Sequence, residues 1–224
     1  MRLSNLRDGV LLIAALALVG CATNRSVLKV ASPVAVQPSA ASATLRAVVI
    51  RSVKDERVFE ESPSVASTPS LGFGGATNAT EAVKARAVAR KRGGFGKAMG
   101  DVLLDEGQTV AGVVRENLAN SLQATGYRVV NNAEPADDAI TIDVAIKKYW
   151  AYFRPGFAQI ALDADIETDI TIAGAAAPLV ITAHVEDRRQ AATERAWLQV
   201  LEEALAAYRK EAVAKLPGLA TLGR

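Results

Sequence analysis

The sequence predicts an α+β fold, a two-layer sandwich in which a mixed, mostly antiparallel sheet carries two main helices on one face. Three segments, 139–153, 159–173 and 178–187, alternate apolar and polar residues with a period of two. That period is typical of long strands with one buried and one solvent-exposed face, joined as an antiparallel meander. Two further segments, 109–125 and 193–216, repeat apolar residues every three or four positions, as amphipathic helices do.

The first half of the folded domain is expected to contain one strand, a long loop and a helix. Residues 45–53 are rich in β-branched side chains, which favours a strand. Residues 54–80 contain several Pro and Gly residues and predict a long loop, a kind of segment that is either functional or disordered. Residues 80–92 favour a helix that is capped by Asn78 and has a basic last turn. The alternation over 86–90 would instead suit an edge strand.

The second half of the domain is predicted from its turns and caps. Gly126 ends the first long helix, and residues 127–130 follow as a strand parallel to the first strand, through a right-handed crossover. Pro155-Gly156 and residues 174–178 are the expected turns between the three long strands. Thr193 is expected to cap the N-terminus of the last helix.

The N-terminal segment has the features of an export signal. Two arginines precede an unbroken apolar run over residues 10–19, which is too short to span a bilayer. Gly20 then precedes Cys21, the one cysteine of the chain. The tetrapeptide Leu-Val-Gly-Cys resembles the lipobox of bacterial lipoproteins, which implies cleavage of a signal peptide at residues 1–20 and lipid attachment to Cys21. An ordinary signal peptide, or a buried N-terminal helix, is the alternative.

Lipidation would determine where the mature protein resides. Ala22 stands where the inner-membrane retention signal of enteric-type bacteria has Asp, so the resemblance implies an outer-membrane anchor and a periplasm-facing protein. Residues 21–43 are expected to be the lipidated cysteine and a flexible tether, and 44–224 a single periplasmic domain. Removal of residues 1–20 takes away two arginines and one aspartate and lowers the formal net charge from +2 to +1. Such a balance argues against nucleic acid as a partner.

The order of the segments resembles that of the YajG-like envelope lipoproteins. The resemblance rests on the lipobox, on residues 53–57 after the first strand, on the glycine-bearing run 89–96, on residues 122–130 around the end of the first long helix, and on the later meander and helix. It spans most of the mature domain and implies a location and a fold, but no reaction and no catalytic residues. The insertion over 62–80 departs from the compact pattern of the family and leaves the role of this loop open.

Carboxylates line the polar face of the second long strand at every other position: Asp163, Asp165, Glu167 and Asp169. Asp143 and Glu186 are expected on neighbouring strands of this face. Side chains two apart on a strand are about 6–7 Å from each other, so pairing with Lys147 and Arg188 is favoured over a divalent-cation site. His184 is expected to be an exposed structural residue, because one histidine cannot build a multi-histidine metal site. We therefore predict no metal and no cofactor.

A basic segment includes Arg90, Lys91 and Arg92. With the glycines that follow and Lys97 it faintly resembles a phosphate-binding loop, but Ala98 stands where that motif requires Ser or Thr. The segment could meet anionic headgroups, lipopolysaccharide or an acidic partner. It could equally be a solvated helix face.

Five of the eleven aromatic residues lie around the tip of the first predicted hairpin: Tyr149, Trp150, Tyr152, Phe153 and Phe157. The period of two places Tyr149 and Phe153 on the solvent-exposed face, which suggests a contact surface that includes Arg154. The alternative is a sheet end covered by the C-terminal helix or by the long loop.

These features predict a non-enzymatic, lipid-anchored outer-membrane protein that binds an envelope partner or supports the envelope structurally. The aromatic hairpin and the basic segment are the expected contacts. An accessory subunit of an envelope export or lipid-transport complex is the alternative function. An enzyme that acts on envelope material is disfavoured, because no Ser, His and Asp set and no metal-ligand set converges in the sequence. The sequence leaves the partner and the oligomeric state open.

Overall fold

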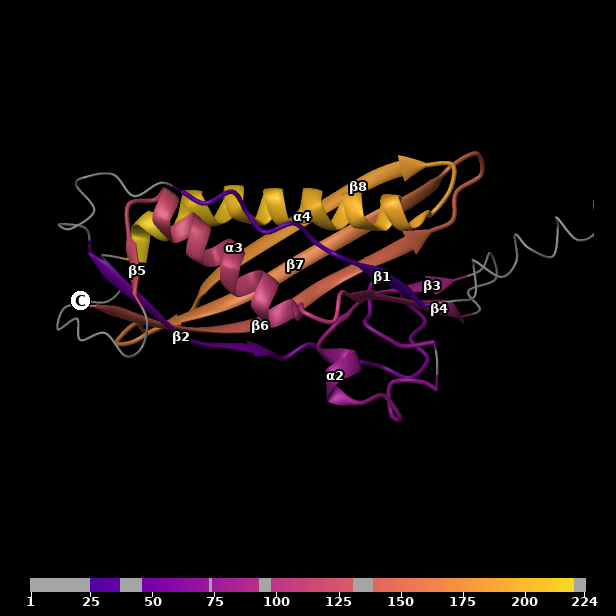
Figure 1. Cartoon of the computed structure of the whole chain (residues 1–224), viewed down its shortest axis with the longest axis horizontal. Coiled ribbons are helices and arrows are strands. Elements are labelled where there is room, and N and C mark those ends of the chain that lie inside the picture. The colour runs from indigo at the N-terminus through magenta and orange to yellow at the C-terminus, as the bar shows by residue number, and fades with distance from the viewer. Residues whose placement is uncertain (1–24, 37–45, 73, 93–97, 131–138, 220–224) are drawn as a thin grey trace, which may run out of the picture.

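The computed structural model of the chain describes residues 25–36, 46–72, 74–92, 98–130 and 139–219. Within this part of the chain, eight strands form one mixed sheet and two long helices cover one of its faces, which confirms the predicted α+β sandwich (Figure 1). The strands are β1 (Ser26–Leu28), β2 (Ala47–Asp55), β3 (Ala87–Arg92), β4 (Ala98–Leu104), β5 (Arg128–Val130), β6 (Ile140–Arg154), β7 (Ile160–Ile172) and β8 (Leu179–Arg189). The helices are α2 (Glu81–Lys84), α3 (Val110–Ala124) and α4 (Glu194–Lys215), and a 3-10 turn over Leu216–Gly218 follows α4.

Strand β6 is the centre of the sheet. One of its edges pairs with β7 along almost its whole length, and the other edge pairs with β2 near the start of β6 and with β3 near its end. Strands β6, β7 and β8 form the predicted antiparallel meander. β2 pairs in parallel with β5, as predicted, and β4 and then β1 extend the sheet beyond β3.

Helices α3 and α4 lie side by side on the sheet and enclose the main core (Figure 1). Thr109 and Thr193 cap them, and each threonine side chain accepts a hydrogen bond from the backbone N–H three residues later. Gly126 has a φ of 86° directly after α3, the left-handed conformation that ends helices. The predicted apolar faces are buried, and the Tyr208 hydroxyl of α4 shares a hydrogen bond of 2.9 Å with Thr168 of β7.

The prediction of one helix over 80–92 is wrong. The helix α2 is a single turn, and Thr80 caps it in place of the predicted Asn78. The rest of the segment forms β3, an internal strand and not the edge strand of the alternative interpretation. Alanine favours helices locally, but Ala87 and Ala89 are fully buried here, and pairing with β4 and β6 outweighs that preference.

Two strands have no counterpart among the predicted elements. Strand β4 contains Gly100 and the fully buried Asp101, so it lacks a clear alternating pattern.

Strand β1 lies inside the predicted tether and pairs in parallel with β4. The Gln108 side chain then bonds the N–H and the C=O of buried Val30, at 3.0 and 2.8 Å. The prediction of a flexible tether is therefore wrong for residues 26–30, which belong to the folded domain.

We expect Leu201→Ala to lower the free energy of unfolding by about 2–5 kcal/mol, because Leu201 of α4 is buried in the core and its truncation leaves a cavity. Val213→Ala on the same helix is the matched control. Val213 is 39% exposed, so its truncation should change the free energy of unfolding by about 0.5 kcal/mol at most. Urea unfolding followed by circular dichroism measures both, and equal losses would contradict the orientation of α4.

Candidate functional site

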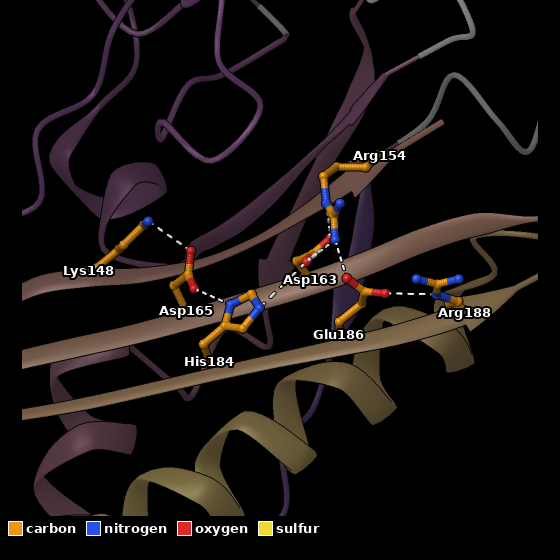
Figure 2. Close-up of polar contacts among 7 residues, drawn as sticks. All are labelled: Lys148, Arg154, Asp163, Asp165, His184, Glu186 and Arg188. Carbon is orange, nitrogen blue, oxygen red and sulfur yellow. Dashed lines mark hydrogen bonds and ion pairs between the residues drawn. The ribbon is translucent and has the colours of Figure 1, made fainter. Parts of the chain in front are cut away.

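The polar face of the meander β6, β7 and β8 carries a network of charged side chains (Figure 2). At its centre lies Asp163 of β7, which is 1% exposed. Arg154, at the end of β6, donates hydrogen bonds of 2.7 Å to both oxygens of this carboxylate, from Nε and Nη2. The same guanidinium pairs with Glu186 of β8, which lies directly opposite Asp163. Carboxylates that face each other across strands repel, and Arg154 offsets this repulsion.

The network continues along β7 to Asp165 (Figure 2). Its carboxylate lies 2.7 Å from Lys148 Nζ and 2.7 Å from His184 Nδ1, so it joins side chains of all three strands. His184 is exposed, as predicted. At the other end of the network, Arg188 Nε donates a hydrogen bond of 2.8 Å to Glu186.

The electrostatics of the network favour charged, paired side chains. Hydrogen bonds to the two carboxylates raise the pKa of Arg154 above its ordinary value. Hydrogen bonds from Arg188 and Arg154 lower the pKa of Glu186. Burial alone would raise the pKa of Asp165, but hydrogen bonds from its lysine and histidine neighbours bring it below its ordinary value. Paired anions of this kind suit a structural network better than proton transfer in catalysis.

A register shift in β6 between Ile146 and Lys148 changes which side chains reach the network. The prediction that Lys147 pairs with the β7 carboxylates holds only in part. Lys147 forms its ion pair with Glu56 at 2.7 Å and is attracted more weakly by Asp169 and Glu167, whereas Lys148 pairs with Asp165. One signal in the sequence marks the position of the shift. Lys148 is the first charged residue in the even-numbered apolar series of this strand.

The register shift also buries two of the aromatic residues predicted to form a surface. Tyr149 is fully buried in the core under the helices, where burial raises its pKa. Trp150 is 1% exposed and packs on the opposite face with Leu71 and Phe59 of the segment 56–80. The prediction that Tyr149 lies on an exposed contact surface is therefore wrong, and the alternative of a covered sheet end holds for both residues.

The tip of the hairpin between β6 and β7 is the exposed part of the aromatic segment. Tyr152 and Phe153 are half-buried against opposite faces of the sheet, so the predicted exposure of Phe153 is also wrong, whereas Phe157 is fully exposed. Gly156 forms the predicted turn, and a Cβ at this position would lie 2.2 Å from the carbonyl oxygen of Gln159. A hollow of about 330 Å³ lies at the tip, lined by residues 154–161 together with Glu186 and Arg188.

The basic residues Arg90, Lys91 and Arg92 lie on β3, so the hypothesis of a solvated helix face is wrong. All three are half-buried. Arg92 faces the segment 56–80, where Nη1 and Nη2 each lie 3.4 Å from an oxygen, the carbonyl of Pro63 and the hydroxyl of Ser70.

The remaining predicted sites lie apart from this network or outside the described residues. Cys21 and the glycines of the basic segment belong to ranges that the structure does not describe. Asp143 accepts hydrogen bonds from Arg51 and Ser52, which lower its pKa to about 2. Among the described residues, no group of three or more His, Cys, Asp or Glu is placed to hold a metal ion. The same residues include no helix with the length and apolar character that a membrane crossing needs.

Comparisons with known proteins give only distant structural similarity. No protein-family model matches the chain, and no curated protein matches it either. One solved structure, of an uncharacterised protein, aligns over 86% of this chain and 99% of its own, with 12% identity and a TM-score of 0.45. Protein XCC0632 from Xanthomonas campestris, of the family DUF330, aligns over 88% and 98%, with 8% identity and a TM-score of 0.44. Neither similarity bears on function, and the resemblance to the YajG-like lipoproteins stays a prediction.

We expect Asp163→Asn to lower the free energy of unfolding by about 1–3 kcal/mol, because Arg154 loses a carboxylate partner that is buried. The Arg154 side chain is 49% exposed, which keeps the loss below that for a fully buried pair. Arg188→Gln is the control, since this side chain is 74% exposed and its ion pair should contribute about 0.5 kcal/mol at most. Chemical unfolding of the three proteins measures both values. A loss for Asp163→Asn no larger than that of the control would show that the network does not stabilise the meander.

Proposed function

We propose that the protein is a lipid-anchored lipoprotein of the outer membrane, facing the periplasm, and that it is a non-enzymatic binding or structural module of the envelope. The sequence Leu-Val-Gly-Cys that ends at Cys21 supports the lipid anchor, and Ala22 after it supports the outer membrane. The resemblance to the YajG-like envelope lipoproteins supports the same compartment. Two or more acyl chains would hold such a protein stably on a membrane that it does not cross.

The observation that carries the binding role is the complete exposure of Phe157 at the hairpin tip. Large aromatic side chains are enriched among the residues that dominate binding energy in protein interfaces. The double hydrogen bond between Arg154 and Asp163 braces the base of this tip, so that the aromatic ring is presented on a preorganised support. The hollow beside it supplies a concave surface for a side chain of an envelope protein.

The charge network supports a role without catalysis. Asp163, Asp165 and Glu186 are each engaged by a basic side chain from a neighbouring strand. A general base or a nucleophile needs a free lone pair near a reacting group, and these oxygens are engaged in strand-to-strand contacts. The network therefore supports a structural role for these residues.

In-cell photo-crosslinking from position 157 tests the proposed contact. A photoreactive amino acid in place of Phe157 should capture one envelope protein, because the side chain is fully exposed beside the hollow. The matched control is the same amino acid in place of Val213, which is 39% exposed near the C-terminal end of α4. That end of α4 lies against the start of β8, away from the hairpin tip, as the hydrogen bond from Lys215 to Val180 shows.

A cross-linked product from position 157 alone is the expected outcome. Absence of any product from this position, or the same product from both positions, would contradict a contact at the tip. The identity of the captured protein separates the two functional candidates. A component of an export or lipid-transport complex would support the alternative, in which this chain is an accessory subunit.

Mass spectrometry of the protein from its native host tests the anchor. We expect a mature chain that begins at Cys21 and carries acyl groups, because the lipobox-like sequence ends at this residue. Cys21→Ser should remove the acyl groups, because serine offers no thiol for the lipid, while the circular dichroism spectrum of the folded domain stays the same. A wild-type chain that retains residues 1–20 without acyl groups would show that the proposed anchor is wrong.

A further inference from the structure

Two arginines of β3, Arg90 and Arg92, form no ion pair with the described residues. The Nε and Nη1 atoms of Arg90 are buried and have no hydrogen-bond partner within the described ranges. Arg92 makes two long hydrogen bonds of 3.4 Å to uncharged oxygens. Burial lowers the pKa of Arg92, and the nearby charge of Arg90 lowers it further. Buried polar groups without partners are rare in native structures and require an explanation.

The nearest carboxylates are already engaged. Asp101 of β4, directly across the ladder from Arg90, is fully buried and accepts hydrogen bonds from a backbone N–H at 2.7 Å and from another arginine at 3.3 Å. Glu61, in the segment 56–80, accepts hydrogen bonds from the N–H and the hydroxyl of Thr77, at 3.0 and 2.9 Å. These bonds are the main cause of its lowered pKa, and the charge of Arg90 contributes less, without an ion pair between the two side chains. In the part of the chain that the structure describes, neither Arg90 nor Arg92 forms an ion pair.

Arg57 shows how this fold satisfies a buried arginine. Its side chain is 0% exposed, pairs with Asp55 at 2.7 Å, and donates to the backbone carbonyl groups of Lys84, Ala87 and Tyr149. A buried charge without such partners destabilises the folded state. Arg90 is half-buried, and its Nε and Nη1 atoms lack the hydrogen-bond partners that Arg57 has.

We propose that Arg90 and Arg92 bind the phosphate group of a small anionic ligand, either inorganic phosphate or the phosphomonoester of a lipid headgroup. Guanidinium groups offer forked N–H donors that match phosphate oxygens. A phosphomonoester carries about −1.5 to −2 charges at pH 7, which two adjacent arginines neutralise. Strand β3 runs parallel to β6 with Ala89 opposite Ala151, so the site lies at the same end of the sheet as the hairpin tip. The proposal goes beyond the protein contact at that tip and does not require it.

Isothermal titration calorimetry of the mature, lipidated protein in a non-ionic detergent tests the site. The titrants are inorganic phosphate and sn-glycerol 3-phosphate, a soluble lipid headgroup, at constant ionic strength. We expect saturable binding of at least one, and Arg90→Gln should weaken it by about 10- to 100-fold, the loss for hydrogen bonds to a charged group. Arg128→Gln is the matched control, because it removes the same charge from an exposed side chain on β5 and should leave binding unchanged.

The thermal unfolding midpoint without ligand separates loss of the site from loss of the fold. Arg90→Gln removes no hydrogen bond of Nε or Nη1, so its midpoint should not fall below that of the wild type. Tighter binding of glycerol phosphate than of phosphate supports a lipid source, and the reverse order supports free phosphate. The titration of the wild-type protein tests the proposal even if a variant does not fold. If neither compound binds, or if Arg90→Gln and Arg128→Gln weaken binding equally, the proposal is overturned.

Discussion

Strand β6 has to satisfy different neighbours along its length. Its first half pairs with β2 and buries one face, under the helices, whereas its second half lies beside β3 and buries both faces, because the segment 56–80 covers the opposite side. A strict alternation of apolar and polar residues cannot meet both demands. The register shift between Ile146 and Lys148 allows one buried face before it and two buried faces after it. It directs Lys148 into the charge network and buries Tyr149 and Trp150 on opposite sides of the sheet. The carbonyl group of Tyr149 then accepts a hydrogen bond from Arg57, which ties the segment after β2 to the centre of the sheet.

The elements that sequence reasoning predicts well are those whose own residues contain the pattern of burial. Both long helices begin at a capping threonine and carry an apolar stripe, and the meander strands alternate over ten or more residues. Strands β3 and β4 have no such pattern, because their buried positions include alanines, Gly100 and the charged Asp101. Their strand conformation comes from pairing with each other and with β6, which is tertiary information. Strand β1 has three residues in a linker-like composition, and only its contacts to β4 make it part of the domain.

The candidate site also has some features that local sequence predicts and others that depend on tertiary structure. The exposure of His184 and Phe157 follows from local sequence, an alternating strand in one case and a Pro-Gly turn in the other. The partners of Arg154 cannot be predicted from local sequence, because Asp163 and Glu186 face each other only once β7 and β8 are in register. A single-residue shift would move every one of these side chains to the other face of the sheet. The sequence thus supplies the types of charged residue, while cross-strand geometry decides which of them are paired.

Two groups of charged side chains lie at this end of the sheet. Those of the meander network are paired with opposite charges, whereas Arg90 and Arg92 of β3 form no ion pair, and this difference separates a structural role from a binding role. In the meander, Lys148 and Arg154 meet carboxylates of neighbouring strands, so these charges stabilise the register and leave Phe157 as the exposed feature of the tip. On β3, Arg90 interacts with the charge of Glu61 but forms no ion pair with it among the described residues. Glu61 fits against Gly75, where a Cβ would lie 1.6 Å from its Oε1, and it is bound there by Thr77. Gly75 has a φ of 77°, which residues with a side chain rarely adopt, and the missing Cβ leaves room for the Glu61 carboxylate. The same fold surrounds Arg57 with partners, and the missing hydrogen-bond partners of Arg90 are the observation on which the proposed anion site rests.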